Sequence, residues 1–332
     1  MCPKCHHIKH VPFTCKSRFC NSCGSKYSAD RALAMSAKLL DNEHRHVVFT
    51  IAEELRPYFA YDRDLLNLLF EAVAETLFFC FARRNKTENY TPGFICVLHT
   101  FGRDLKWNPH IHVILCTSAV SRFGKWKNFN HINYEGLRKS WQFCLLRLMQ
   151  TKIQTPQFNL LVDKLYASYN NGFYVNAPPI KRFSAGIVNY ILRYAGRPVL
   201  AQSRIKGYDG NTVTFDYTPH GSNTLVTESV PVFDFIKRLI IHIPDRNFKM
   251  IRYFGFYARS HKMHKNYILR RKKIDSAYLA ARKRTLKSWR RRIITSFSHD
   301  PLKCSCGSHY ELIEIFYPLP YKPKFFLLPN TS

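Results

Sequence analysis

Apolar and polar positions alternate in three segments of the first 120 residues. This period predicts β-strands, because successive side chains of a strand point to opposite faces. The segments are HVVFTI at 46–51, PGFICVLHTFG at 92–102 and WNPHIHVILCTSAV at 107–120. The connection between the last two is short and rich in turn-forming residues, among them Gly102 and Asp104. These two strands are therefore expected to form a hairpin.

A period near 3.6 residues predicts five helices, and two more segments have the pattern of strands. The expected helices are 28–44, 63–84, 133–150, 184–196 and 232–244. The further strands are 172–180 and 212–219, and 251–260 is interpreted as a turn-rich connection. Because strands alternate with helices around a central hairpin, we expect an α+β fold with an antiparallel sheet flanked by helices.

The charge of the chain indicates a polyanionic partner. Lys and Arg number 51 against 22 Asp and Glu, so the formal net charge is +29. Nucleic acid is the first partner expected to compensate such a surplus, ahead of an anionic membrane surface. No apolar stretch approaches the ~20 residues that cross a bilayer, and the N-terminus has no signal-peptide core. We therefore expect a cytoplasmic protein that binds DNA and no membrane.

Five of the eleven cysteines lie within the first 23 residues, which is typical of metal binding in a reducing compartment. Two C-x-x-C pairs have the spacing of zinc knuckles, and their four thiolates suit one tetrahedral zinc ion. These four are Cys2, Cys5, Cys20 and Cys23. Further candidate ligands lie between the pairs: Cys15, His6, His7 and His10. The alternative is a set of reduced cysteines without metal.

A second cysteine pair, Cys304 and Cys306, lies near the other end of the chain. Its C-x-C spacing holds zinc less well than C-x-x-C. Either a metal pair or an inert pair is consistent with the sequence.

Two histidines, His110 and His112, stand one residue apart on the third predicted strand, so both imidazoles point to the same face. His99, on the preceding strand, is expected beside them as a third ligand. Three neutral imidazoles leave open coordination positions on a divalent ion, which suits polarising a substrate oxygen. Imidazoles alone favour Mn²⁺ or zinc over Mg²⁺, and a bound phosphate can supply oxygen ligands. The alternative is two half-buried histidines that bond to loop carbonyls.

A pair of tyrosines lies on the helix predicted at 184–196. Tyr190 and Tyr194 are four residues apart and therefore share one helix face. A tyrosine that attacks phosphorus forms a covalent phosphotyrosine, which conserves the energy of the broken DNA bond. Arg193 and Arg197 are candidates to hold neighbouring phosphates. Core packing is the alternative explanation for such a stripe.

Together these motifs resemble the two-tyrosine HUH transposases of the insertion-sequence 91 family. NPHIHVIL is similar to the HUH motif, YILRY to the paired-tyrosine motif, and CKSRFCNSCG to the N-terminal zinc-binding domain. The resemblance covers nearly the whole chain. It implies an HUH endonuclease fold and metal-dependent nicking of single-stranded DNA with Mg²⁺ or Mn²⁺. Nicking would leave a 5′-phosphotyrosine and a free 3′-OH, followed by strand transfer in rolling-circle-like transposition.

By motif position the resemblance makes His110 and His112 metal ligands and Tyr190 and Tyr194 the nucleophiles. Zn²⁺ is the implied structural metal. The expected domains are a zinc-binding domain at 1–40, a catalytic domain at 41–260 and a basic C-terminal region at 261–332. The chain departs from the family at Asn108, where a further histidine is common, and in CSCG, where a knuckle has lost a residue. It also opens directly on MCPKC, which predicts a truncated N-terminus.

Residues 261–292 contain thirteen Lys or Arg and one acid, Asp275. We expect this stretch to follow the DNA backbone without reading sequence. The residues expected to contact DNA there are Arg270, Arg271, Lys272, Lys273, Arg290, Arg291 and Arg292.

Three other functions are compatible with parts of the pattern. A non-catalytic, zinc-dependent DNA-binding protein, such as a decayed transposase, would bind DNA without an adduct. An HUH replication initiator or relaxase would use the same chemistry, but the zinc domain and the tyrosine spacing argue against both. A metallohydrolase of small molecules leaves the charge unexplained. The sequence indicates no oligomeric state.

Overall fold

The computed structural model divides into two compact units, Met1–Thr14 with Lys287–Ser332, and Cys15–Leu286. These borders differ from the domain borders expected at 40/41 and 260/261, because the first unit joins the two ends of the chain. The residues that the structure describes are 1–11, 15, 20, 23–24, 28, 35, 38–40, 42–82, 88–129, 131–178, 199–219, 221–262 and 288–315.

The larger unit is built on an antiparallel sheet with the strand order β5-β1-β3-β2-β9, and β4 pairs with the far end of β3. Its strands are β1 (His44–Thr50), β2 (Tyr90–Phe101), β3 (Trp107–Ser121), β4 (Trp126–Asn128), β5 (Val175–Asn176) and β9 (Ile251–Gly255). The predicted hairpin is β2 with β3, at the centre of the sheet. The strand that carries H-x-H is therefore supported by a partner on each side.

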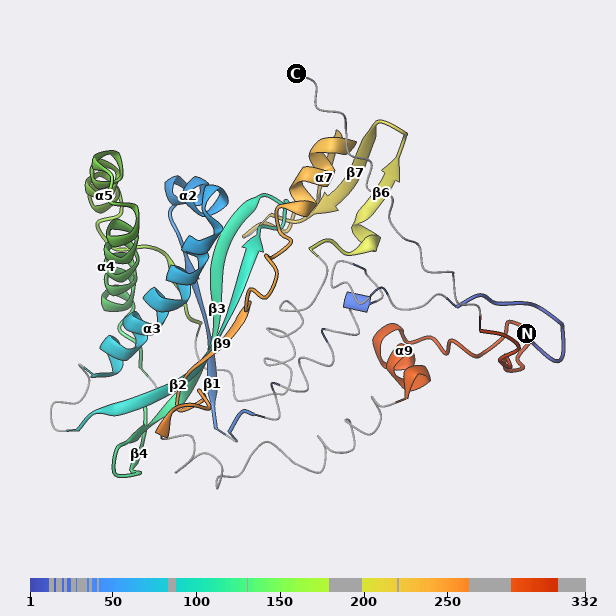
Figure 1. The fold of residues 1–332 in the computed structure, drawn as a ribbon, viewed down its shortest axis with the longest axis horizontal. Helices are drawn as coiled ribbons and strands as arrows, with labels where there is room; N and C mark the ends of the chain where they lie inside the picture. The colour runs from blue at the N-terminus through green and yellow to red at the C-terminus, as the bar shows by residue number, and fades with distance from the viewer. Residues whose placement is uncertain are drawn as a thin grey trace, which may run out of the picture. The chain divides into compact units, whose positions relative to one another are not determined.

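Helices cover one face of this sheet (Figure 1). They are α2 (Arg56–Tyr61), α3 (Leu66–Ala82), α4 (Tyr134–Ile153) and α5 (Pro156–Ser168), with short 3₁₀ turns η1 (Glu53–Leu55) and η2 (Arg63–Leu65). Alternate strand residues such as Phe49 and Ile111 pack with helix residues such as Trp141 into one apolar core. The α+β class with an antiparallel sheet flanked by helices is confirmed.

The segment Arg63–Ala82 is long and apolar enough to cross a membrane by composition alone. The expectation that no stretch reaches this length is therefore wrong. However, 56% of its apolar window is buried, and residues such as Leu69 and Phe70 belong to the core under the sheet. It has the packing of a core helix.

The opposite face of the sheet carries a smaller apolar cluster and a row of histidines. Ile95, Val97 and Ile114 pack there with Tyr257 and Leu40. His44 is 1% exposed on this face and is held between the carbonyl of Asn42 and the hydroxyl of Tyr257. Because every second residue of a strand shares a face, His46, His110 and His112 point the same way.

A second, three-stranded sheet packs at the tip of the β2–β3 hairpin (Figure 1). Its strands are β6 (Ile205–Tyr208), β7 (Thr212–Tyr217) and β8 (Val226–Pro231). The 3₁₀ turn η3 (Gln202–Arg204) precedes them, and helix α7 (Val232–Ile240) follows them. Leu105, at the hairpin tip, is buried with Phe215 and Phe235. The buried ring of His242 bonds to the Leu105 carbonyl and to Thr100. These contacts hold the tip of the β2–β3 hairpin in place.

Several elements differ from the sequence prediction, and strands β4, β6 and β8 fall in stretches for which no element was predicted. The segment expected to be a turn-rich connection contains β9, which ends at Gly255 with φ +56°, where a Cβ would collide with the Pro92 carbonyl. Helix α5 falls in a stretch for which no element was predicted; Thr155 caps it, and Pro156 occupies its first turn. In the smaller unit, α9 (Trp289–Phe297) begins in the last residues of the basic stretch at 261–292 and extends beyond it.

Candidate metal centres

Three histidines of the central hairpin form the first candidate metal centre. His99 and His110 are directly opposite each other in the β2–β3 register, and His112 is two residues further along β3. Their nitrogen ligand atoms all lie within 4.8 Å of one another. His99 is buried, whereas His110 and His112 are half-buried. The cluster therefore has a buried base and a side that solvent or substrate can reach.

Hydrogen bonds determine which ring nitrogens are available. The His110 Nδ1 lies 2.7 Å from the Asn108 carbonyl, which only accepts, so this nitrogen carries the proton and Nε2 keeps its lone pair. The His112 Nδ1 lies 2.8 Å from the Nε2 of His46, on the neighbouring strand β1. This contact engages the Nδ1 of His112. Outer-shell partners of this kind orient metal-binding imidazoles in proteins.

The protonation states of these rings suit metal binding. Burial, and next the nearby His110, lowers the pKa of His46 to about 4. Burial likewise lowers the pKa of His110 and places that of His112 well below its ordinary value. The rings of His46, His110 and His112 are therefore neutral near pH 7. For His110 and His112 this is the form that coordinates a metal.

A cation lies near the histidines. Burial chiefly lowers the pKa of His110, and the charge of Arg56, the first residue of α2, lowers it further, whereas the Asn108 hydrogen bond raises it. The Arg56 guanidinium is 3.3 Å from Glu53, and the Arg56 carbonyl accepts a hydrogen bond from the Trp107 indole. The structure therefore places one cation, paired with a carboxylate, near the histidines.

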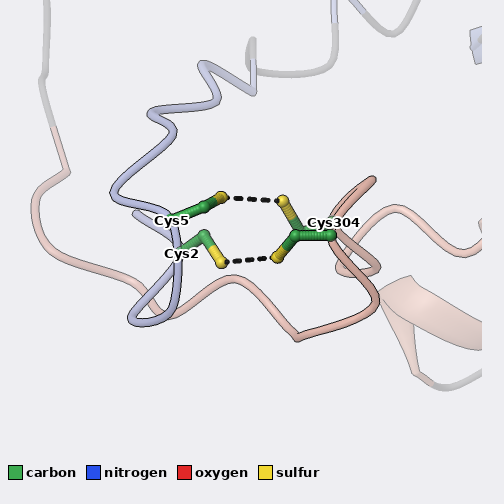
Figure 2. A group of neighbouring side chains, drawn as sticks. Cys2, Cys5 and Cys304 are labelled. Carbon is green, nitrogen blue, oxygen red and sulfur yellow. Dashed lines mark hydrogen bonds between the residues drawn. The ribbon is translucent and has the colours of Figure 1, made fainter.

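Four cysteines form the second candidate centre, in the smaller unit. Figure 2 shows Cys2 and Cys5 directed toward the facing segment that carries Cys304. The Sγ atoms of Cys5 and Cys304 are 3.6 Å apart, and those of Cys2 and Cys306 are 3.5 Å apart. The Cys306 N–H and then the Tyr310 hydroxyl lower the pKa of Cys304 to about 5, which favours its thiolate.

A third group consists of Cys15, Cys20 and Cys23, with 3.6 Å between the Sγ atoms of Cys15 and Cys23. No fourth His, Cys, Asp or Glu joins it among the described residues. The expected single site of two C-x-x-C pairs is thus not the grouping that the structure forms. The first pair instead meets the C-terminal C-x-C, because the chain ends pair with each other.

Comparison with known proteins places the chain in a family. Residues 93–265 match a family model described as "Putative transposase", and residues 1–51 match a "Transposase zinc-binding domain" of insertion sequence 91. The chain belongs to this transposase family. The expected family is thereby confirmed.

Individual relatives agree with this placement. The chain is 31% identical over 266 residues to the "Transposase for insertion sequence element IS801" of Pseudomonas savastanoi pv. phaseolicola; the alignment covers 76% of this chain and 64% of that protein. It is 26% identical over 284 residues to the "Putative transposase y4qJ" of Sinorhizobium fredii, covering 80% and 71%. The chain therefore spans less than two thirds of the first relative. No solved structure matches.

The tyrosine motif that is expected in this transposase family lies outside the described residues. This applies to Tyr190, Tyr194, Arg193 and Arg197. The flanks of the motif are described. On the N-terminal side, Asn176 pairs with Val48, which is itself opposite His112. On the C-terminal side, Val199 and Leu200 pack at the tip of the histidine hairpin.

Part of the basic stretch is described. Arg270, Arg271, Lys272 and Lys273 lie outside the described residues. On α9, Arg290 makes two hydrogen bonds to Asp300, and this pairing lowers the pKa of Asp300 to about 2. Arg291 and Arg292 lie on the same helix. Arg290 is therefore engaged within the protein, which its sequence position did not predict.

Sequence reasoning missed His46 and Arg56. A signal for His46 was available, because His44 and His46 repeat the H-x-H spacing at the start of a predicted strand. Its meaning depends on β1 lying next to β3, which the sequence does not specify. Nothing in the sequence around Arg56 distinguishes it from the other arginines.

Proposed function

We propose that this protein is a DNA strand transferase that nicks single-stranded DNA through a covalent 5′-phosphotyrosine intermediate. The observation that carries the proposal is the cluster of His99, His110 and His112, whose nitrogen ligand atoms all lie within 4.8 Å of one another. The proposal also rests on membership of the transposase family.

The donor set fits a divalent ion with an open coordination sphere. Three imidazoles occupy one side, and the half-buried positions of His110 and His112 leave the other side open to a phosphate. Since Mg²⁺ prefers oxygen ligands and Mn²⁺ also accepts imidazole, Mn²⁺ is the better match to these residues, with Mg²⁺ the alternative. When bound, the ion would polarise a non-bridging oxygen of the scissile phosphate.

The chain would supply the nucleophile and the counter-charge. The phenolic oxygen of Tyr190 or Tyr194 bonds to phosphorus, the P–O3′ bond breaks, and the 3′ oxygen leaves with a proton as a free 3′-OH. Arg56 would balance charge on the phosphate near His110. The support for the tyrosine assignment is the motif itself and the position of its flanks, beside β1 and at the hairpin tip.

Two tyrosines give a division of labour. One can hold a DNA end covalently while the other attacks the next phosphate, which a transposase needs in order to pass a strand. The net charge of +29 would hold the DNA, in the cytoplasm where the nucleoid lies. The zinc-binding region would recognise the element ends.

The test is to incubate the full chain with labelled single-stranded DNA from the element ends and Mn²⁺ or Mg²⁺, and to look for an adduct on a denaturing gel. Tyr190→Phe and Tyr194→Phe should each retain some adduct but fail in strand transfer, and the double variant should form none. Tyr61→Phe, at a position 96% exposed, is the matched control.

An adduct in the double variant would place the nucleophile elsewhere. DNA binding by the wild-type chain without any adduct, with either metal, would overturn the proposal and favour a non-catalytic DNA-binding protein.

A further inference from the structure

The four cysteines of the smaller unit have the geometry of a closed metal site. A zinc ion with tetrahedral Zn–S bonds of about 2.3 Å places its sulfur atoms about 3.8 Å apart. The Sγ pairs of Cys2 with Cys306 and Cys5 with Cys304 are 3.5 and 3.6 Å apart, and all four atoms lie within 4.8 Å of one another. A disulfide needs about 2.0 Å, so these contacts are not disulfides.

The backbone of each loop is shaped to present two sulfur atoms. In the N-terminal loop the Cys2 N–H donates to the His7 carbonyl, and the His6 N–H donates to the Cys2 carbonyl. In the C-terminal loop the Cys304 N–H donates to Ser308, and the Gly307 N–H donates to Cys304. Gly307 has φ +87°, a conformation that glycine adopts without strain. Both loops are therefore tight turns that place two cysteines on one side.

Contacts outside the sulfur atoms hold the two loops together. Met1 and Glu311 exchange two backbone hydrogen bonds of 2.8 and 2.9 Å. The His7 ring lies 2.7 Å from the Tyr310 hydroxyl, and the Lys9 ammonium donates to the Pro301 carbonyl. The pairing of the chain ends thus has partners at several points along both segments.

An apolar core does not account for this unit. None of the three hydrophobic clusters includes a residue from 1–11, 288–294 or 298–315, the parts of the unit whose side chains the structure describes. The buried residues there are Cys2, Cys304 and Pro301, and larger apolar side chains such as Ile8 and Leu312 are exposed. A small unit without a core needs another source of folding free energy, which a bound metal supplies.

We propose that one zinc ion joins the two ends of the chain through four thiolates: Cys2, Cys5, Cys304 and Cys306. The C-x-C pair is thereby a functional half-site. The ion closes a chain segment of about 300 residues, whose closure is entropically unfavourable without it. It also anchors α9, because Asp300 receives Arg290 from that helix and the Leu302 N–H from the cysteine loop. The zinc unit therefore presents a basic helix.

The experiment measures zinc in the full chain by elemental analysis after dialysis. Cys2→Ser, Cys304→Ser and Cys306→Ser should each lose one equivalent relative to the wild type, and the Cys2→Ser/Cys304→Ser double variant should lose no more than either single variant. Cys80→Ser, in α3, is the matched control and should lose none. Unchanged zinc in folded Cys304→Ser and Cys306→Ser would overturn the proposal.

Replacing Cys20 separates this site from a site built of the N-terminal cysteines alone. If Cys2 and Cys20 share an ion, Cys20→Ser alone loses the same zinc equivalent as Cys2→Ser while Cys304→Ser retains it, and the proposal fails. If they belong to different sites, removing Cys20 lowers only the zinc held by the other group, and Cys304→Ser still removes the ion of Cys2.

A second measurement uses the wild-type chain and does not depend on the folding of variants. The Cys5 side chain is exposed, yet coordination should protect it from alkylation by N-ethylmaleimide. Mass spectrometry should show Cys5 and Cys306 protected together and labelled together after a chelator is added. Rapid labelling of Cys306 in zinc-loaded protein would contradict the proposal.

Discussion

The histidine and cysteine clusters assemble their ligands in opposite ways. The three histidines come from one hairpin within fourteen residues of sequence, and two of them, His110 and His112, are only half-buried. The four cysteines come from the two ends of the chain and surround a closed position between sulfur atoms. An open set of neutral nitrogens suits an exchangeable ion that meets a substrate, whereas a closed set of sulfurs suits an ion that maintains structure.

The sharpest test of this comparison removes one ligand from each centre. His110→Ala should lower adduct formation by about 100-fold or more while the zinc content stays unchanged, because only phosphate polarisation is removed. Cys304→Ser should lose zinc and still form adduct at saturating DNA. His131→Ala, at an exposed position, is the control for removal of a histidine. Absence of adduct in both variants would show that the two centres are not separate in function.

Acid should weaken the histidine face through His44. Burial lowers its pKa from 6.5 to about 4, so the folded chain keeps this ring neutral while the unfolded chain protonates it. Stability is therefore full above pH 6.5 and declines as the pH falls toward 4, by about 3 kcal/mol for this group. Denaturant titrations of the wild type and of His44→Gln at pH 7 and pH 5 measure this. An equal decline in both would assign the effect to other groups.

His46, the hydrogen-bond partner of the proposed metal-binding histidines, can be tested separately from the ligands themselves. His46→Ala removes the hydrogen bond to His112 Nδ1 and should raise the Mn²⁺ concentration for half-maximal adduct by about 10- to 100-fold. Because His46 positions a ligand and does not supply one, excess Mn²⁺ should restore adduct formation. His110→Ala should not be restored. Failure of the rescue would give His46 a direct role.

The smallest expected effect concerns α9. Replacing Arg291 and Arg292 by Ala should flatten the dependence of log K on log salt by about one unit for each DNA phosphate that the helix no longer neutralises. Lys164→Ala, on the exposed side of α5, is the control cation. Binding measured across a range of salt concentrations decides this, and an unchanged slope would place the DNA path elsewhere.

Local patterns predicted the histidine site well. The alternation around His110 specified the face of the strand, and Gly102 and Asp104 indicated the turn, so the juxtaposition of His99 with the pair followed from nearby residues. Strand β9 was missed because adjacent aromatic residues and glycine in IRYFG do not alternate clearly between apolar and polar. Its place depends on pairing with β2, which lies far earlier in the chain.

The cysteine site could not be predicted in the same way. Spacing identified Cys2 and Cys5 as one half-site, but it contains no information on which distant pair completes it. The nearest pair, Cys20 with Cys23, was the natural choice, and the structure brings in Cys304 and Cys306 instead. His46 was missed for the same reason, because its role depends on strand order.

The pairing of residues 1–14 with 287–332 has a consequence for biosynthesis. Ribosomes add about 5–20 residues per second, so the N-terminal loop emerges on the order of tens of seconds before its partner exists. During that interval Cys2 and Cys5 are nascent thiols whose nearest available sulfurs are those of Cys15, Cys20 and Cys23. The order of synthesis thus sets up a kinetic competition for metal, which can be resolved only after Cys304 and Cys306 have been synthesised.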